Sequence, residues 1–486
     1  MFIGREDELN TLKKSLDRRS ATFIAIKGRR RIGKSRLIEE FSNDFSKTLL
    51  FTGIPPTPGV TKQSQREEFI KQMTRQGLPN IQANDWSDLF WIVAKEAEKG
   101  SVLVALDEIA WMGSKDPVFL GKLKIAWDLY FSKNPNLVLV VASSISSWID
   151  KNILNSTGFF GRIDLRLTLE ELALKECSQF FGKREKTISA YEKLQILSIT
   201  GGVPKYLEAI NPKITVEENI RNLCFSKDGL LFNEFDSIFH DLFSRRGEAY
   251  KHIVEALVES QSLSQIEICK IIKRKNGRLI SEYLKDLVEA GFLSADFTWD
   301  IKTGKVSKLR KYRLSDNYLR FYLKYIAPNK EKILKNGFKK RSLHGAIQWE
   351  TIMGFQFENL VVHNSETVID LLNIPIEDYT YDGPFFQTKT NERRGCQIDY
   401  LIQAKNTLYV CEIKFSKNPI EPKVIEEVEK KARALSIPKY FTYRPVLIHV
   451  GGVTDEVVYR DYFDKIIDWT ELLSPESKKE GKGNVS

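Results

Sequence analysis

The residues near the start of the chain that are best suited to chemistry are a glycine, a lysine and a serine at fixed spacing in GRRRIGKS, residues 28–35. Gly28 and Gly33 permit a backbone whose successive N–H groups surround an oxyanion. Lys34 adds a mobile positive charge, and the Ser35 hydroxyl can hold Mg²⁺. The spacing predicts a phosphate-binding loop for a nucleoside triphosphate, with nucleotide contacts from Gly28, Arg29, Arg30, Arg31, Ile32, Gly33, Lys34, Ser35 and Arg36.

An acidic pair suited to triphosphate hydrolysis follows the apolar run SVLVAL, at Asp107 and Glu108. We expect Asp107 to orient Mg²⁺ and its waters, and Glu108 to act as the general base toward the attacking water. The alternative is a buried strand that ends in an ordinary surface turn. With the phosphate loop upstream, the pair favours hydrolysis.

Two further residues could act on the terminal phosphate. Ser143 follows the apolar run 136–142 and could report hydrolysis; the alternative is a helix N-cap for residues 145–150. Arg162, in GFFGRIDLRL, could serve as an arginine finger in cis or from a neighbouring subunit. Its alternative role is an ordinary surface arginine.

A second group of chemically suited residues lies in QIDYLIQAKNTLYVCEIKFS, where Asp399 is followed by Glu412 and Lys414. Alternation along a strand puts Glu412 and Lys414 on one face, and a helix over 350–362 offers Glu358 as a third acid. Such a cluster can bind Mg²⁺ or Mn²⁺ and stabilise a phosphodiester under attack. The alternative is a domain that binds without cutting. The metal-binding residues predicted for the two sites are Ser35 and Asp107, and Asp399 and Glu412.

The elements that position the first site read as an α/β domain. The strand at 22–27 and the runs at 101–106 and 136–142 are almost continuously apolar, as in parallel strands buried on both faces. A helix begins at Ser35 and directs the positive end of its dipole at the phosphates.

The middle of the chain predicts three short helices and a hairpin, which is the pattern of a winged helix. The helices are expected at 250–259, 264–273 and 278–290, and the strands at 292–299 and 305–314. Basic groups at the third helix and the wing favour DNA contact, although a protein-contacting module is the alternative. The candidate DNA-binding residues are Lys275, Asn276, Arg278, Lys302 and Lys305.

Composition supports a folded chain with a polyanionic partner. Hydrophobic content is 42% and aromatic content 11%, above the values of disordered chains. The net charge of +10 is concentrated in residues 245–341, which carry 23 Lys and Arg against 11 Asp and Glu. The five cysteines show no metal-ligand spacing, and no apolar run is long enough to span a bilayer. We expect a cytoplasmic protein without a membrane partner.

The order of these motifs resembles the archaeal-type ATPase family, a branch of the AAA-related and signal-transduction ATPases with numerous domains. The resemblance rests on FIGREDEL, GRRRIGKS, ALDE, the GR before a strand and TGGVPKYL, across roughly residues 1–241. It implies a RecA-like P-loop core with a helical lid, in which Gly201, Gly202 and Pro204 lie near the nucleotide. The three consecutive arginines inside the phosphate loop depart from the usual pattern.

The C-terminal acids resemble the PD-(D/E)XK fold of restriction-endonuclease-like nucleases, although Ile398 replaces the usual proline before Asp399. The predicted organisation is an ATPase core (1–165), lid (166–241), winged helix (242–328), basic linker (329–343), C-terminal α/β nuclease-like domain (344–474) and disordered tail (475–486).

These features predict a magnesium-dependent ATPase switch coupled to a DNA-facing winged helix and a nuclease-like domain. The alternatives are a non-cleaving regulator that binds DNA or protein, and a defence or toxin effector nuclease. ATP, double-stranded or branched DNA and further copies of the chain are the expected partners.

Overall fold

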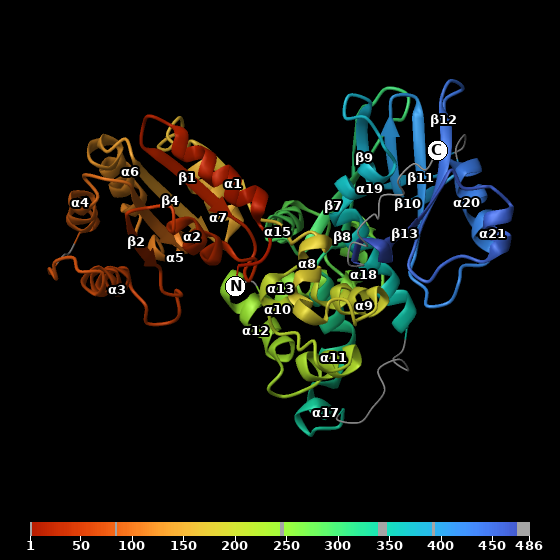
Figure 1. The fold of residues 1–486 in the computed structure, drawn as a ribbon, viewed down its shortest axis with the longest axis horizontal. Helices are drawn as coiled ribbons and strands as arrows, with labels where there is room; N and C mark the ends of the chain where they lie inside the picture. Colours follow the sequence, from red (N-terminus) through yellow and green to blue (C-terminus); the bar gives the residue numbers. More distant parts are fainter. Residues whose placement is uncertain (1, 83–84, 244–246, 339–347, 391–393, 474–486) are drawn as a thin grey trace, which may run out of the picture. The chain divides into compact units, whose positions relative to one another are not determined.

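The computed structural model describes residues 2–82, 85–243, 247–338, 348–390 and 394–473 (Figure 1). Packing divides them into two compact units, one formed mainly by residues 2–172 and the other mainly by residues from 173 onward. Among the described helices, none is long and apolar enough to cross a membrane. The tail at 475–486 and part of the basic linker, 339–343, lie outside the described residues.

The first unit is built on a five-stranded parallel sheet in the order β2-β3-β4-β1-β5. Strands β1, β3 and β4 are almost entirely buried because their apolar residues face helices on both sides, whereas β2 and β5 are partly exposed. This confirms the expected α/β class and the RecA-like core. The strands are β1 (Thr22–Lys27), β2 (Lys47–Thr52), β3 (Val102–Asp107), β4 (Leu137–Ser143) and β5 (Leu165–Thr168).

Alternate side chains along the strands point to opposite faces of the sheet and pack into two separate hydrophobic cores. Phe23 and Ala25 of β1 face the core shared with α3, α4 and α6, whereas Ile24 and Ile26 face the core shared with α1 and α2 (Figure 1). The helices are α1 (Glu6–Lys14), α2 (Lys34–Ser42), α3 (Lys62–Arg75), α4 (Trp86–Glu96), α5 (Ile109–Met112), α6 (Phe119–Leu129) and α7 (Ser146–Ile149). Because the strands are parallel, the loops that follow β1, β3 and β4 meet at one edge of the sheet.

The second unit begins with a group of helices in the region predicted as a lid. Ser189 and Thr215 cap two of them, with side chains that accept from Glu192 N and Glu218 N. The helices are α8 (Leu174–Ser178), α9 (Ala190–Thr200), α10 (Pro204–Leu207), α11 (Val216–Cys224) and α12 (Leu230–Phe243).

Three helices and a small sheet follow, where the sequence predicted them. The helices are α13 (Gly247–Leu257), α14 (Gln265–Ile271) and α15 (Arg278–Glu289). The strands β6 (Leu263–Ser264), β7 (Leu293–Trp299) and β8 (Val306–Leu314) form an antiparallel sheet in the order β6-β8-β7. The next helices are α16 (Asn317–Phe321) and α17 (Lys330–Leu334), so the first part of the basic linker is helical.

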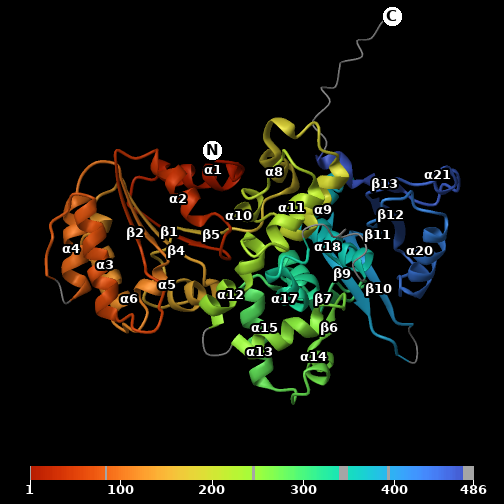
Figure 2. The same ribbon diagram turned by 90° about the horizontal axis from the view of Figure 1, so that it is seen from below.

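The C-terminal region holds a mixed five-stranded sheet in the order β13-β12-β11-β10-β9, with α18 and α20 packed against it (Figure 2). Strands β9, β10 and β11 are antiparallel, whereas β12 runs parallel to β11. The strands are β9 (Tyr379–Gln387), β10 (Cys396–Ala404), β11 (Thr407–Lys414), β12 (Thr442–His449) and β13 (Lys465–Asp468). The helices are α18 (Trp349–His363), α19 (Ser365–Leu371), α20 (Lys423–Ala434) and α21 (Asp455–Tyr459).

The β7–β8 hairpin shares a core with the C-terminal sheet. Trp299 and Ile301 lie in the same hydrophobic cluster as Ile398 and Leu401. The Trp299 indole N–H also donates to Gln403 Oε1 at 2.6 Å. The predicted wing is therefore packed inside the second unit.

Candidate functional sites

The loop between β1 and α2 has the backbone that the GRRRIGKS pattern predicts. Gly33 has φ 95°, in the left-handed region that favours glycine. A Cβ at Gly28 would lie 2.6 Å from the Leu169 carbonyl oxygen, so no side chain fits there without backbone movement. Both glycines are thus required by the path of the loop.

Lys34 turns back into this loop. Its Nζ donates to Gly28 O at 3.0 Å and to Arg29 O at 3.1 Å. The side chain is buried, and burial lowers the pKa of Lys34, an effect that the Glu108 and Asp107 carboxylates oppose. The loop therefore holds an ammonium group at its centre, where anionic oxygens would replace carbonyl acceptors.

Arg5, in the FIGREDEL segment, supports the loop from behind. Its Nη2 donates to Ile32 O at 3.2 Å and to Glu170 O at 2.5 Å, while Nη1 pairs with Glu8 at 2.6 Å. The residue is 5% exposed. This role could not be predicted from the sequence, because the residues around Arg5 contain no signal for a contact with Ile32, 27 positions away.

Asp107 and Glu108 leave β3 at the edge that carries the loop. The Ser35 hydroxyl donates to Asp107 Oδ2 at 2.5 Å, so the two predicted Mg²⁺ ligands are in direct contact. Glu108 Oε2 accepts from the backbone N–H and the hydroxyl of Ser144, at 3.0 and 2.9 Å. Burial raises the pKa of Glu108, the direction expected for a general base tuned toward neutral pH.

The structure distinguishes the two serines after β4. Ser143 is buried, and its hydroxyl accepts from Ile145 N at 3.1 Å, a contact in the turn before α7; the N-cap of α7 is Ile145, so Ser143 does not have the alternative role of an N-cap. Ser144 is the serine that contacts Glu108. Periodicity could not separate two adjacent hydroxyls, because their roles depend on the direction in which the chain leaves the strand.

Arg162 lies near the opposite edge of the sheet. It precedes β5, whose Leu165 pairs with Ile24 in the first half of β1. A six-residue strand spans about 20 Å, so the phosphate loop is out of reach of this side chain. Arg162 instead makes a two-point contact with Asp128, at 2.7 and 2.9 Å, which lowers the pKa of Asp128 to about 2. Of the two predicted finger roles, the one in cis does not fit this geometry.

Gly201, Gly202 and Pro204 lie between α9 and α10 in the second unit. Gly201 ends α9 with φ 59°, and Pro204 is the first residue of α10. The two units are described separately, so the expected place of these residues beside the nucleotide stays a prediction.

The C-terminal acids come together on neighbouring strands. Pairing of Tyr400 with Cys411 sets Asp399 beside Glu412. Lys431 of α20 joins them: its Nζ donates to Asp399 Oδ1 at 3.1 Å and to Glu412 Oε2 at 2.5 Å. Burial and the Asp399 charge raise the pKa of Glu412. Burial opposes protonation of Lys431, but the two carboxylates outweigh it and raise the pKa of Lys431.

Lys414 contacts Glu412, which lies on the same face of β11, and also contacts Glu427, which the sequence did not predict. Its Nζ lies 2.9 Å from Glu412 Oε1 and 2.9 Å from Glu427 Oε2. Lys431 and Glu427 both lie on α20, 32 and 28 positions beyond Asp399, and the strand pattern contained no signal for either. In the described part of the chain, no three His, Cys, Asp or Glu residues are grouped as a metal site.

Glu358 of α18 lies near Asp399, and a residue of the loop between α13 and β6 donates a hydrogen bond to its carboxylate. Gln261 Nε2 donates to Glu358 Oε2 at 2.7 Å, and Gln261 Oε1 accepts from Gln397 Nε2 at 2.7 Å. Burial and the Asp399 carboxylate raise the pKa of Glu358 to about 8. The module formed by α13–α15 and β6–β8, here called the helical module, thus supplies a hydrogen bond to the candidate catalytic acid Glu358.

A buried arginine holds this loop in place. Nη1 of Arg320 donates to the carbonyl oxygens of Leu257, Val258 and Ser260 at 3.3, 2.7 and 3.2 Å. Burial lowers the pKa of Arg320 to about 9. Gln261 follows directly, so its position depends on Arg320.

The candidate DNA-binding residues are solvent-exposed and fall in two places. Lys275, Asn276 and Arg278 lie before and at the start of α15, where the Asn276 side-chain oxygen accepts from Gln265 at 2.6 Å. Lys302 and Lys305 lie at the hairpin turn. Their contact with DNA stays a prediction.

Comparison with known proteins gives a family match in the N-terminal part of the chain and a relative along most of its length. Residues 2–210 match the model of a family described as an ATPase domain predominantly from Archaea. Over 458 residues the chain is 24% identical to an uncharacterized protein of Methanocaldococcus jannaschii, MJECL04, covering 92% of this chain and 95% of that one.

Two solved structures give the scale of the structural likeness. The Walker-type ATPase of Pyrococcus abyssi aligns with a TM-score of 0.50 and 16% identity, over 66% of this chain and 96% of that one. The ORC2 protein of Aeropyrum pernix, in ADPNP and ADP complexes, aligns with a TM-score of 0.42 and 15% identity, over 68% and 94%. The likeness to the Pyrococcus abyssi ATPase supports a shared fold, whereas the likeness to the ORC2 protein is too distant to support a conclusion.

Proposed function

We propose that residues 2–210, an archaeal-type P-loop ATPase domain, act as an ATP-hydrolysing switch for the C-terminal half of the chain. The observation that carries this proposal is the convergence of Lys34, Ser35, Asp107 and Glu108 at one edge of the sheet. Glu108 is the base: its carboxylate is held by Ser144 and its pKa is raised by burial.

Mg²⁺ fits the residues present, because the Ser35 hydroxyl and the Asp107 carboxylate form an adjacent pair of oxygen ligands. Bound there with the nucleotide, the ion would neutralise charge on the phosphate oxygens. The chain itself holds the phosphates through the loop N–H groups and Lys34, and Glu108 accepts the proton of the attacking water.

The test is the Glu108→Gln variant, which keeps the shape of the side chain and removes the base. We expect nucleotide binding to be retained and ATP turnover to fall by about 10²-fold or more. Glu96→Gln, the same change at an exposed position of α4, is the matched control. Wild-type turnover by Glu108→Gln would rule out this residue as the base.

We further propose that the C-terminal sheet is a restriction-endonuclease-like domain and that α13–α15 with β6–β8 form a DNA-facing winged helix. Three features support the first assignment: the antiparallel β9–β11 group, the parallel β12 after α20, and the meeting of Asp399 with Glu412 and two ammonium groups. Acids and ammonium groups together suit attack on a phosphodiester.

Cleavage is tested by incubating supercoiled and branched DNA with the full chain and Mg²⁺ or Mn²⁺. We expect nicking or cutting by the wild type and none by Asp399→Asn. Glu426→Gln, an exposed acid on α20, controls for loss of charge alone. Equal cutting by wild type and Asp399→Asn would place the activity elsewhere.

The second candidate is a regulator that binds without cleaving, and one observation favours it. Lys431 Nζ lies between the Asp399 and Glu412 carboxylates, so the chain's own ammonium balances their charge. If the wild type does not cut under any of these conditions but still binds DNA in a nucleotide-dependent way, the regulator is the better description.

A further inference from the structure

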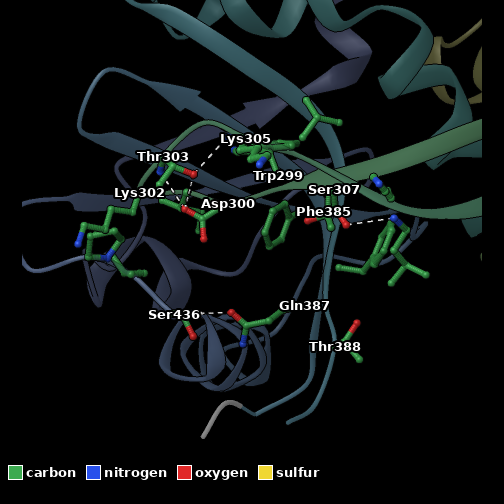
Figure 3. A pocket seen from close by; sticks show the side chains of 18 of the residues that line it. Trp299, Asp300, Lys302, Thr303, Lys305, Ser307, Phe385, Gln387, Thr388 and Ser436 are labelled. Carbon is green, nitrogen blue, oxygen red and sulfur yellow. Dashed lines mark hydrogen bonds between the residues drawn. The ribbon is translucent and has the colours of Figure 1, made fainter.

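A groove runs between the β7–β8 hairpin and the end of β9. It encloses about 810 Å³ and is lined by residues 298–309 without Gly304, by residues 385–390 without Lys389, and by residues 436–438. Figure 3 shows the hairpin residues Asp300 to Lys305 on one side and Gln387, Thr388 and Ser436 on the other. Its volume suits a few residues of an extended polymer.

The charge of the groove is positive. Lys302, Lys305 and Lys308 line it, all three are exposed, and within the described residues none of them takes part in an ion pair. The acid among the lining residues is Asp300, whose Oδ1 already accepts from Thr303 N and Oγ1 at 2.8 and 2.9 Å. The turn therefore presents three ammonium groups and one exposed carboxylate, so its net charge is positive.

The rest of the lining is mixed, with hydroxyl groups and with apolar side chains that include the exposed Val306 and Leu309. Ser307 adds a hydroxyl group on the hairpin side, and Thr388 adds one on the opposite side (Figure 3). Trp299 and Phe385 form the floor and are each 3% exposed, so their ring faces are not open for stacking. A ligand would be held through charge and hydrogen bonds, without base-specific contacts.

The hairpin is not free to enter the groove of a duplex. A Cβ at Gly304 would lie 3.8 Å from Tyr381 Cε2, and the Trp299 indole N–H is bonded to Gln403. The tip is thus seated against the C-terminal sheet, and its lysines face a slot.

The slot is connected structurally to the candidate nuclease acids. Phe385 pairs with Ile398, the residue before Asp399. Gln387 binds the end of α20, accepting from Ser436 N at 2.9 Å and donating to Ala434 O at 2.8 Å (Figure 3). Helix α20 carries Lys431, so one wall of the slot is built on the elements that hold the acids.

We propose that this slot binds the sugar-phosphate backbone of a single nucleic-acid strand, independent of base sequence. The three lysines bind successive phosphates, and the hydroxyl groups of Ser307 and Thr388 donate to the same oxygens. Binding at the slot deepens the proposed DNA-facing role of the β7–β8 hairpin, and the further idea that the strand continues toward Asp399 rests on the proposed nuclease function.

The experiment measures anisotropy of a fluorescein-labelled 20-mer oligodeoxynucleotide with the full chain in EDTA, from 50 to 200 mM salt. The triple variant Lys302→Gln, Lys305→Gln, Lys308→Gln should bind at least about tenfold more weakly at the lower salt. Its slope of log affinity against log salt should be shallower by about 2, since each lost phosphate contact removes roughly 0.7.

Three comparisons make the test decisive. The triple variant Lys417→Gln, Lys423→Gln, Lys465→Gln removes exposed charges elsewhere on the same sheet domain and should bind like the wild type. If Lys275→Gln with Arg278→Gln abolishes single-strand binding while the slot variant does not, the proposal is overturned. Binding of poly-glutamate as tight as that of the oligonucleotide would also overturn it, because the slot would then be an acidic-peptide site.

Ribo- and deoxyribo-oligonucleotides of the same sequence distinguish RNA from DNA as the source of the strand. Failure of the nuclease proposal is separable: Asp399→Asn should bind the oligonucleotide normally whether or not the wild type cuts. Unchanged ATP turnover and thermal unfolding of the slot variant show that it is folded.

Discussion

The two candidate sites of this chain hold their charged groups in different ways. At the phosphate loop, Lys34 is held by carbonyl oxygens five and six positions away. At the C-terminal acids, Glu358 is bonded to Gln261, 97 positions away, and Asp399 to Lys431, 32 positions away. The phosphate loop thus holds its own lysine, with Asp107 and Glu108 added from the end of β3, whereas the second site is assembled from β10, β11, α18, α20 and the α13–β6 loop.

The same contrast applies to the two buried carboxylates. Burial raises the pKa of both Glu108 and Glu358, and each accepts a side-chain hydrogen bond. The donor to Glu108 is Ser144, which directly follows the neighbouring strand β4 of the same sheet. The donor to Glu358 comes from the helical module, so movement of that module would change the acid's environment. The environment of Glu108 is therefore fixed within its own sheet, whereas the environment of Glu358 depends on the position of the α13–β6 loop.

The largest expected effect is at the loop-held site. Lys34→Ala removes the buried ammonium, and we expect nucleotide affinity to fall on the order of 100-fold or more. Titration with a fluorescent ATP analogue measures it, with Lys47→Ala as the control at an exposed surface pair. Near-normal binding by Lys34→Ala would mean that the loop N–H groups alone hold the phosphates.

The next effect concerns the donor to Glu108. Ser144→Ala removes one hydrogen bond to the charged form, so the pKa of Glu108 should rise further and less of the base form remains at neutral pH. We expect turnover at pH 7 to fall about tenfold and the acidic limb of the pH–rate profile to move to higher pH. Ser143→Ala is the matched control, and an equal loss in both variants would contradict the assignment.

A smaller effect is expected on stability at the assembled site. Glu358 has a pKa of about 8 in the folded chain, above its unfolded value, so the folded state binds more protons between these limits. Its contribution to the free energy of unfolding therefore declines as pH rises from about 5 to 8. Glu358→Gln should lose this decline, which thermal unfolding across that pH range measures. Parallel curves for wild type and variant would show that Glu358 is not buried as described.

The smallest effect is expected for Arg162→Ala in dilute protein. Arg162 lies at the far edge of the sheet from the loop, so turnover should change by less than about twofold. A large loss that appears only at concentrations where the chain self-associates would support the finger role from a neighbouring subunit. A large loss in dilute protein would contradict the geometry.

The arrangement of the phosphate loop could be predicted from the sequence, because the strand, the loop and the helix that form it are consecutive in the chain. It chose Ser143 over Ser144 because spacing does not specify the direction of a turn. It found Asp399, Glu412 and Lys414 from strand alternation, but Lys431, Glu427 and Gln261 become neighbours only through folding. The three central strands β1, β3 and β4 followed from their apolar runs, whereas β2 was not predicted and the packing of the hairpin on the C-terminal sheet had no local pattern.

That packing has a consequence for cutting the chain into pieces. Trp299 and Ile301 belong by position to the helical module, yet they complete the hydrophobic core around Ile398 and Leu401. A polypeptide that began after the basic linker would lack two buried side chains and present an apolar hollow in their place. The two halves should then behave as a split protein, each poorly soluble alone and restored by complementation when the other half is supplied.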